Sequence, residues 1–462
     1  MPRRSVPGRS ILRRLAHVIW AVALPIAGCD ETTGPPGPPT LTLDAELRQS
    51  LARWGVVPVG PMSAQSPARV ELGRALFFDP ILSGNRDISC ATCHHPAEAL
   101  GDGRSLPVGT GGSGRGATRV LGADRELVPR SSPSLLNSGL GMQYLFWDGR
   151  LALGHFTLAE AQDPIPFPAA LTRTLEMQAV MPLLDRREMR GQPGDLDVLG
   201  SPNELAELAD DRHDEIWRAV VERLLTVPAY VDLFNGAFPG TPPGAFGIEH
   251  VARTLAAFQK EAFTRTGSPF DRYLDRDDHA LNGGQKRGAL LFFGDAGCGG
   301  CHGGPFLGGQ GFANVGVPQI GPGVGAERPL DLGRGEIFGD FYRFAFRVAP
   351  LRNVELTAPY MHNGAFGTLE DVVRHYDDVP ASLRAYDPSH LDPAAGALHH
   401  GDDATVDAVL GTLDFRVSAP LEMSDADVAD LVAFLEALTD PSARDLRHLV
   451  PEAVPSGLSV QR

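Results

Sequence analysis

Hydrophobic residues recur with helical spacing in two long parts of the chain. Segments 251–263 and 428–438 place apolar side chains three or four residues apart, which is the period of one face of an α-helix. In segments 109–116 and 303–325 glycine is frequent and this period is missing, so both are expected to be loops. The pattern predicts a mainly α-helical protein.

A short apolar segment occurs twice along the chain. Residues 72–78 read LGRALFF and residues 287–293 read RGALLFF, which indicates an internal duplication. Proline and glycine cluster at residues 238–244, so we place a domain boundary there, although a surface loop within one domain is the alternative. The expected divisions are an N-terminal domain of residues 46–243, a C-terminal domain of residues 244–445 and a tail of residues 446–462.

The first 29 residues have the composition of a secretory signal peptide. Five arginines are followed by a mostly apolar run, and small residues then precede Cys29. This ending resembles the site at which bacterial lipoproteins are cleaved and acylated, so we expect a periplasmic lipoprotein anchored to a membrane through Cys29. A signal peptide with an incidental cysteine is the alternative. Residues 30–45 begin with repeated proline and glycine and are expected to form a tether.

Length, charge and hydropathy limit the number of domains and the classes of partner. A chain of 462 residues is long enough for two domains. Its formal charge of -16 argues against binding to nucleic acid, whose phosphates require a basic surface. Beyond residue 29, no stretch has the roughly twenty apolar residues that a membrane-spanning helix needs.

The four remaining cysteines form two copies of the motif C-x-x-C-H. These copies are Cys90-Ala91-Thr92-Cys93-His94 and Cys298-Gly299-Gly300-Cys301-His302. In this motif both thiols form thioether bonds to a haem and the histidine binds its iron. Disulfides, a zinc site or a thioredoxin-like redox pair are alternatives, but each leaves the two histidines unexplained. We therefore predict two covalently bound haems c, with His94 and His302 as iron ligands.

Three segments, in order, resemble the bacterial di-haem cytochrome c peroxidases and the MauG enzymes. They are residues 72–94 around the first motif, residues 146–150 (FWDGR) and residues 350–364. The resemblance covers most of the chain between about residues 68 and 440. It implies two cytochrome c-like haem domains packed with the haems facing a shared interface. It also implies that the first haem reacts with hydrogen peroxide and the second relays electrons.

The resemblance assigns residues beside the first haem. Family enzymes use a glutamine and a glutamate when the O–O bond of peroxide is broken, and residues 175–189 align Gln178, Pro182 and Glu188 with that segment. We expect Glu188 to act as the general acid and base. Alternatively, Gln178 and Glu188 are surface groups of an acidic protein. The chain between Trp147 and Gln178 also departs from the family, because it is longer than usual.

In many resting peroxidases a histidine plugs the distal face of the first haem. Between His95 and His155 this chain has no histidine, and His95 directly follows an iron ligand. We therefore expect the first haem to be five-coordinate at rest.

The distal ligand of the second haem separates the subfamilies. Peroxidases carry a methionine fourteen positions after the late-signature histidine, and counting from His362 leads to Tyr376, the residue type found in MauG enzymes. A phenolate oxygen favours ferric and higher iron states, whereas a methionine thioether raises the reduction potential. A core tyrosine is the alternative, with Met361, His375 or another side chain as the ligand.

Two further assignments follow from the family. Trp147 lies in the matched segment 146–150 and is expected to carry electrons between the haems, with simple packing as the alternative. Calcium is expected at the backbone carbonyls of Thr357 and Pro359, together with an asparagine whose place is taken by Ser131 or Asn137.

The leading interpretation is a MauG-like oxidoreductase. Hydrogen peroxide would convert the haem pair to a high-valent state that oxidises a partner protein by long-range electron transfer, and residues 178–194 resemble the methanobactin-associated di-haem enzymes most. The alternative enzyme is a peroxide-reducing di-haem peroxidase supplied by a small cytochrome c or cupredoxin. A non-enzymatic di-haem electron carrier is the third possibility, and it requires both irons to be fully ligated by the protein.

Overall fold

The computed structural model describes residues 41–152 and 165–461, and it confirms the mainly α-helical class. Cys29 and most of the expected tether lie outside these residues. The helices are α1 (Leu43–Arg53), α2 (Pro67–Phe78), α3 (Cys90–Cys93), α4 (Thr174–Gln178), α5 (His213–Leu225), α6 (Pro228–Ala237), α7 (Ile248–Phe263), α8 (Pro269–Leu274), α9 (Gly283–Phe293), α10 (Gly335–Phe338), α11 (Leu369–Asp377), α12 (Val379–Arg384), α13 (Pro393–Gly396), α14 (Asp403–Leu410) and α15 (Asp425–Glu436). The strands are β1 (Tyr144–Leu145), β2 (Leu151–Ala152), β3 (Phe312–Ala313) and β4 (Phe346–Arg347), paired antiparallel as β1–β2 and β3–β4.

The duplicated segment forms the same helix in both halves. Helix α2 ends in Phe-Phe ahead of the first cysteine motif, and α9 ends in Phe-Phe ahead of the second. A Cβ atom at Gly73 would lie 2.0 Å from the carbonyl oxygen of Thr254 on α7, and one at Gly288 would lie 1.9 Å from that of Asp430 on α15. The glycine therefore allows the same close helix crossing, α2 on α7 and α9 on α15.

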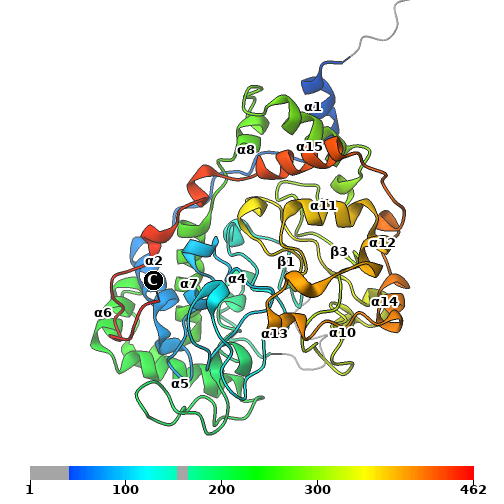
Figure 1. Ribbon diagram of the computed structural model, residues 1–462. Helices are drawn as coiled ribbons and strands as arrows, with labels where there is room; N and C mark the ends of the chain where they lie inside the picture. The colour runs from blue at the N-terminus through cyan, green and yellow to red at the C-terminus, as the bar shows by residue number, and fades with distance from the viewer. Residues whose placement is uncertain (1–40, 153–164, 462) are drawn as a thin grey trace, which may run out of the picture. The chain divides into compact units, whose positions relative to one another are not determined.

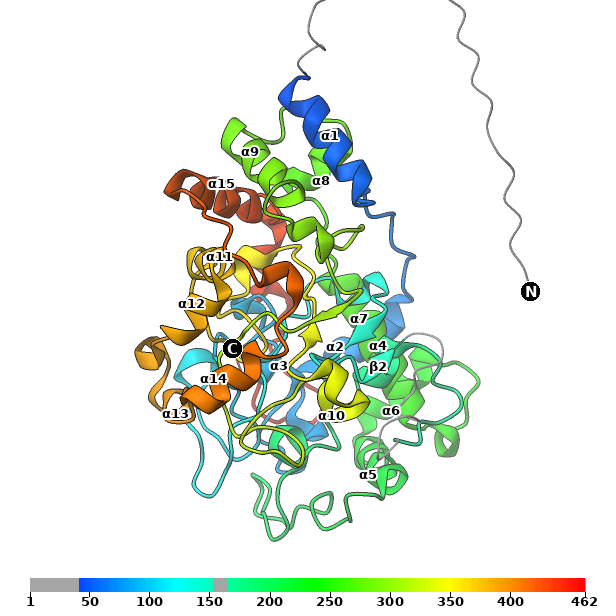
Figure 2. The same ribbon diagram turned by 90° about the vertical axis from the view of Figure 1, so that its right-hand side faces the viewer.

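Two large hydrophobic cores correspond to the two cysteine motifs. The first is built from α2, α5, α6 and α7, and the second from α1, α8, α9, α11 and α15. Figure 1 shows α5, α6 and α7 at lower left, and Figure 2 shows α1 beside α8 and α9. The end of the chain returns to the first core, where Leu446 and Val454 are buried.

A matching pair of asparagines links the two halves. Asn137 and Asn353 both have left-handed backbone conformations, with φ of 63° and 64°. Their side-chain amides donate to the same carbonyl oxygen, that of Arg265, over 3.0 and 3.1 Å. The segment after α7 is thereby held by one asparagine from each half.

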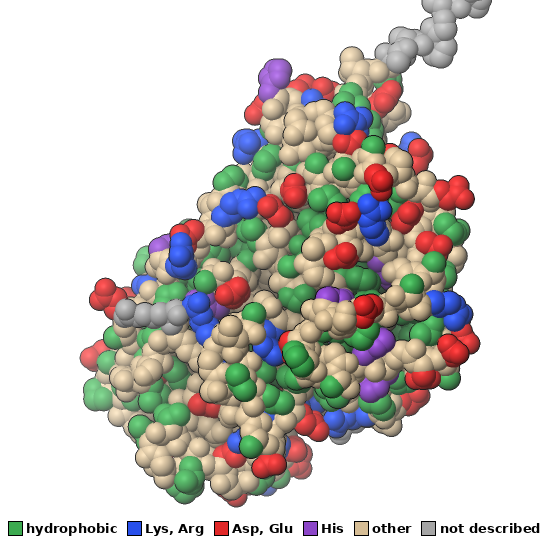
Figure 3. Space-filling model, in the orientation of Figure 1, with side chains coloured by type: hydrophobic (Ala, Val, Ile, Leu, Met, Phe, Trp, Pro, Cys, Tyr) green, Lys and Arg blue, Asp and Glu red, His purple; other side chains and the backbone are tan. Residues whose placement is uncertain are grey.

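The described surface carries charges of both signs. On the face drawn in Figure 3, acidic and basic side chains are interspersed, without a broad basic patch. Within residues 41–152 and 165–461, no helix is long and apolar enough to cross a membrane.

Candidate functional site

The first cysteine motif lies on a single helical turn. Ser89 caps α3 through reciprocal hydrogen bonds with Thr92, and Cys90 and Cys93, three residues apart, therefore face the same way. His94 follows directly, and its Nδ1 lies 3.1 Å from the carbonyl oxygen of Leu100. This hydrogen bond leaves Nε2 available for a metal ion.

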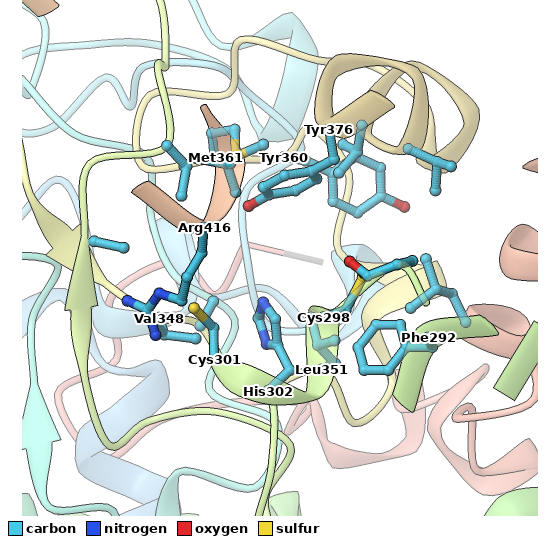
Figure 4. Close-up of a pocket in the computed structure, with 18 of the residues that line it drawn as sticks. Phe292, Cys298, Cys301, His302, Val348, Leu351, Tyr360, Met361, Tyr376 and Arg416 are labelled. Carbon is cyan, nitrogen blue, oxygen red and sulfur yellow. The ribbon is translucent and has the colours of Figure 1, made fainter. Parts of the chain in front are cut away.

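The second motif repeats this arrangement. Cys298 begins a 3₁₀ turn, Cys301 follows it, and Nδ1 of His302 lies 3.0 Å from the carbonyl oxygen of Leu307. In Figure 4, His302 and both cysteines lie along one side of a cavity. Burial lowers the pKa of His94 and of His302 to about 4, so both imidazoles are neutral, as metal ligation requires.

The residues present fit a covalently bound haem in each cavity. None of the four cysteines of the motifs forms a disulfide within the described chain, and each pair lines a cavity together with its histidine. The second cavity also contains Arg347, which is buried without a carboxylate partner among the described residues. Its Nε donates to the Phe146 carbonyl oxygen over 3.0 Å, and its side-chain hydrogen-bond partner is the sulphur of Met142 at 3.7 Å. Burial lowers its pKa to about 10. An unpaired buried guanidinium fits the carboxylate groups of a haem.

The side chains predicted to be distal lie in the wall of the first cavity. Gln178, Pro182 and Glu188 line it together with His94 and Trp147. Gln178 comes from α4, and Glu188 from a turn of π-helix at Arg186–Arg190. The structure thus brings together residues that the chain separates by almost a hundred positions.

The glycine-rich loop allows the π-helical turn to approach. A Cβ at Gly109 would lie only 1.8 Å from the carbonyl oxygen of Arg187, so no larger residue fits there. The next amide, that of Thr110, donates to the carbonyl oxygen of Glu188 over 2.9 Å. Asp185 caps the turn by accepting from the amides of Arg187 and Glu188.

The carboxyl group of Glu188 titrates near neutral pH. Burial raises its pKa to about 8, and the negative charge of Asp185 adds to the rise, while Arg150 and Arg187 oppose it. A carboxylic acid with such a pKa can both release and accept a proton near the pH at which it works.

No distal histidine is seen in the described part of the first cavity. Among its described lining residues, His94 is the only histidine. His155 lies outside the described residues, so five-coordination of the first haem stays a prediction.

Trp147 lines both cavities. Its indole N–H donates to the carbonyl oxygen of Ser131 over 2.8 Å. Its own carbonyl oxygen accepts from the amide of Arg347 over 2.6 Å, and the Arg347 guanidinium lies 5.9 Å from the indole ring centre. The indole is therefore fixed in the wall that the two cavities share.

A buried ion-pair network surrounds this wall. Arg130 binds Asp331 through two hydrogen bonds of 2.7 and 2.8 Å and also contacts Asp148, which Arg150 holds from the other side. Although burial opposes ionisation, Arg150 and Arg130 keep the pKa of Asp148 well below its usual range. The network holds Arg150 in the first cavity, near Glu188.

Tyr376 lies across the second cavity from the cysteine motif, on α11. Figure 4 shows Tyr360, Met361 and Tyr376 on the side opposite Cys298 and His302. Within the described chain the Tyr376 hydroxyl makes no hydrogen bond, whereas that of Tyr360 donates to the carbonyl oxygen of Glu355 at 3.4 Å.

His375, the neighbour of Tyr376, has both ring nitrogens in hydrogen bonds. Its Nδ1 lies 2.9 Å from the Ser382 hydroxyl and its Nε2 lies 2.8 Å from the Val315 carbonyl oxygen. Both ring nitrogens are engaged in hydrogen bonds, whereas Tyr376 and Met361 line the cavity opposite the cysteine motif.

The residues considered for calcium are already partly engaged. The Asn137 side chain also accepts from the amide of Arg265 over 2.8 Å, and the Thr357 hydroxyl donates to the Val354 carbonyl oxygen. Ser131 donates its amide to His362. The carbonyl groups of Thr357 and Pro359 accept no hydrogen bond from described residues, and calcium stays a prediction.

Several arginines of the site were not predicted from the sequence. Arg130 stands three residues before Pro133, as Arg347 stands three before Pro350, so a second internal repeat could have revealed both. Arg150 was part of a matched segment but received no role.

Comparison with known proteins identifies relatives over nearly the whole chain. The family described as di-haem cytochrome c peroxidase matches residues 67–279. The methylamine utilization protein MauG of Methylorubrum extorquens is 31% identical over 451 residues, covering 96% of this chain and 99% of MauG. The cytochrome c551 peroxidase of Pseudomonas aeruginosa is 34% identical over 306 residues, covering 66% of this chain and 70% of the peroxidase.

Solved structures agree on the fold. A MauG-like protein associated with microbial copper homeostasis superposes with a TM-score of 0.56 at 27% identity, covering 85% of this chain and 95% of that protein. The di-haem peroxidase BthA of Burkholderia thailandensis gives a TM-score of 0.55 at 22% identity, covering 88% and 96% of the two chains, and this likeness concerns the fold alone.

Proposed function

This chain belongs to the family of di-haem cytochrome c peroxidases and MauG proteins, and from that premise we propose that it is a MauG-like oxidoreductase acting on a partner protein. In this reaction hydrogen peroxide accepts two electrons and two protons and becomes two water molecules. The two electrons come from the partner. When bound, the two haems supply the redox chemistry that amino-acid side chains cannot provide.

The position of Tyr376 is the observation that favours the MauG-like activity over peroxide scavenging. Its unbonded hydroxyl lies across the second cavity from His302, while the competing His375 is engaged elsewhere. A phenolate is a harder donor than the methionine of peroxide-scavenging relatives, and it suits oxidised iron. Burial raises the pKa of Tyr376, so the hydroxyl is expected to lose its proton only when a cation binds it.

Glu188 is proposed to manage the protons in the first cavity. As a carboxylate it accepts a proton from one oxygen of hydrogen peroxide. It then returns that proton to the other oxygen, which leaves as water. Gln178 and Arg150, in the same wall, are placed to bind and orient polar groups of peroxide. Pro182 shapes the wall without offering a proton.

Trp147 is proposed to conduct electrons between the two cavities. Support for this role comes from its position in both walls and from the hydrogen bond that fixes its ring. Each of the two cavities is lined by a C-x-x-C-H motif, so an indole in both walls lies on the path between the two proposed haem sites.

The proposal is tested on the ferric holoprotein by EPR and optical spectroscopy, followed by stoichiometric peroxide without reductant. One high-spin and one low-spin haem, and a long-lived oxidised species, are expected. Two low-spin haems that resist peroxide until half-reduced would instead identify a peroxide-scavenging peroxidase supplied by a small cytochrome c or cupredoxin. If the half-reduced protein also failed to react with peroxide, the result would identify a non-enzymatic di-haem electron carrier.

Location and the calcium ion complete the proposal. Members of this family are periplasmic c-type cytochromes, and we propose that Cys29 carries a lipid anchor there. Calcium is proposed at the Thr357 and Pro359 carbonyls. Mass spectrometry of the mature N-terminus and calcium analysis of the dialysed holoprotein test these two points.

A further inference from the structure

A basic cleft of about 400 Å³ opens behind the first cavity. Four cationic side chains and one carboxylate line it, with small polar residues between them. The charged residues are Arg69, Arg173, Arg253, Lys260 and Glu176. Three excess positive charges in one cleft are unexpected in a chain whose formal charge is -16.

The cations of the cleft are poorly neutralised. Within residues 41–152 and 165–461 the Lys260 ammonium makes no hydrogen bond, and Arg253 donates only to the Ala170 carbonyl oxygen, over 2.7 Å. The single carboxylate, Glu176, lies 3.9 Å from Nε of Arg173. Burial and the charge of Arg173 lower the pKa of Lys260, and the opposing charge of Glu176 does not offset them.

A helix also begins at this cleft. Ser66 and Arg69, at the start of α2, line it, and the Ser66 side chain makes no capping hydrogen bond. The first amide groups of a helix have no acceptor within the helix, and they favour anions. The free amide groups at the helix start add to the attraction that the four cationic side chains exert on an anion.

The cleft shares two walls with the first cavity. On α7, Lys260 faces the cleft while its neighbour Gln259 faces the cavity; on α4, Glu176 faces the cleft and Gln178 the cavity. A ligand bound among these cations would therefore contact the helices that carry the distal glutamine.

We propose that this cleft is a binding site for a phosphate group, held by Lys260, Arg173, Arg253 and Arg69. Phosphate offers several acceptor oxygens and a charge that matches the excess. The group is supplied either by free phosphate or by the phosphodiester of a lipid head group. This site does not depend on the proposed catalytic function, because binding is measured without peroxide.

The test is isothermal titration calorimetry of the holoprotein at constant ionic strength. Inorganic phosphate and glycerophosphoglycerol, the soluble head group of phosphatidylglycerol, are titrated separately. Saturable binding of either supports the site, and the tighter of the two identifies the source.

Variants link the binding to the cleft. Lys260→Gln and Arg173→Gln should each weaken binding about tenfold, which corresponds to the loss of one charge-assisted hydrogen bond. Lys260→Arg should retain it, which shows that the fold survives changes at this position. Arg218→Gln on α5, which does not line the cleft, is the matched control for removing one exposed arginine. Absence of saturable binding, or equal binding by wild type and Lys260→Gln, would overturn the proposal.

Discussion

The indole N–H of Trp147 donates to the carbonyl oxygen of Ser131 over 2.8 Å. The amide of Ser131 in turn donates to the carbonyl oxygen of His362 over 2.7 Å, and His362 lines the second cavity. A residue from the first half of the chain thereby fixes the tryptophan relative to the second. The orientation of the indole is set by backbone atoms, which do not change when nearby side chains are replaced.

Replacing Trp147 with phenylalanine should slow electron transfer between the two haems. The ring would lose its N–H and its low oxidation potential, so the first haem should still react with peroxide while spectral changes at the second become much slower. Stopped-flow spectroscopy after one equivalent of peroxide measures both. Trp54→Phe is the matched control, because Trp54 also donates to a backbone carbonyl, that of Phe293, but contacts only the second motif. Equal effects of both variants would contradict the bridging role.

Glu188→Gln should slow the reaction with peroxide by about 10²-fold to 10⁴-fold, the usual contribution of a general acid–base group. Because the carboxylate accepts the first proton, the wild-type rate should fall as the pH drops below about 8, the pKa of Glu188. The variant should lack this pH dependence. A rate profile in which wild type and variant follow the same pH curve would exclude Glu188 as the proton acceptor.

Glu188→Gln should be more stable than the wild type at alkaline pH. Burial raises the pKa of Glu188 from 4.5 to about 8, so the folded protein holds a proton that the unfolded chain has released. The free energy of unfolding contributed by this group therefore falls as pH rises through this interval. Thermal unfolding at about pH 5 and about pH 9 should show an advantage of Glu188→Gln that grows with pH. Exposed Glu222→Gln is the control, and a pH-independent difference would argue against a buried, protonated Glu188.

Tyr376→Phe should remove the distal ligand of the second haem, and Tyr376→Met should raise its reduction potential, because a thioether favours the ferrous state. EPR and redox titration of the holoprotein provide the measurements. Tyr360→Phe removes a hydroxyl from the same cavity, but one that already donates to Glu355, and should leave the low-spin signal unchanged. If Tyr376→Phe kept that signal, Met361 would be the better ligand.

Gly73→Ala should destabilise the fold by about 1–3 kcal/mol, the usual cost of overpacking, because the new Cβ would meet the Thr254 carbonyl at 2.0 Å. Gly236, on α6, has open space around its Cα. Gly236→Ala should therefore stabilise the protein by up to about 1 kcal/mol through helix propensity. Chemical denaturation compares the two, and a similar loss in both would mean that the helix crossing tolerates a methyl group.

The helical class and the presence of two haems c could be predicted because both are indicated by local sequence. A C-x-x-C-H motif defines its own geometry within one turn, and the period of 251–263 reflects one helix face, although α7 begins earlier, at Ile248. The pairing of Arg130 with Asp331, and the burial of Arg347 without a carboxylate partner among the described residues, depend on contacts between distant segments. Hydrophobic periodicity carries no information on such contacts, and the raised pKa of Glu188 likewise arises only from three-dimensional burial.

In the C-terminal segment of the described chain, the Ser456 hydroxyl donates to Asp79, the residue that follows α2, over 2.6 Å, and Val454 is buried in the first core. The first core therefore depends on contacts between segments 377 positions apart in the sequence. Until these segments meet, Cys90 and Cys93 belong to an incomplete core in which both thiols are more accessible. Removing residues 453–462 should accordingly destabilise the core around the first cysteine motif, although the two are far apart in the sequence.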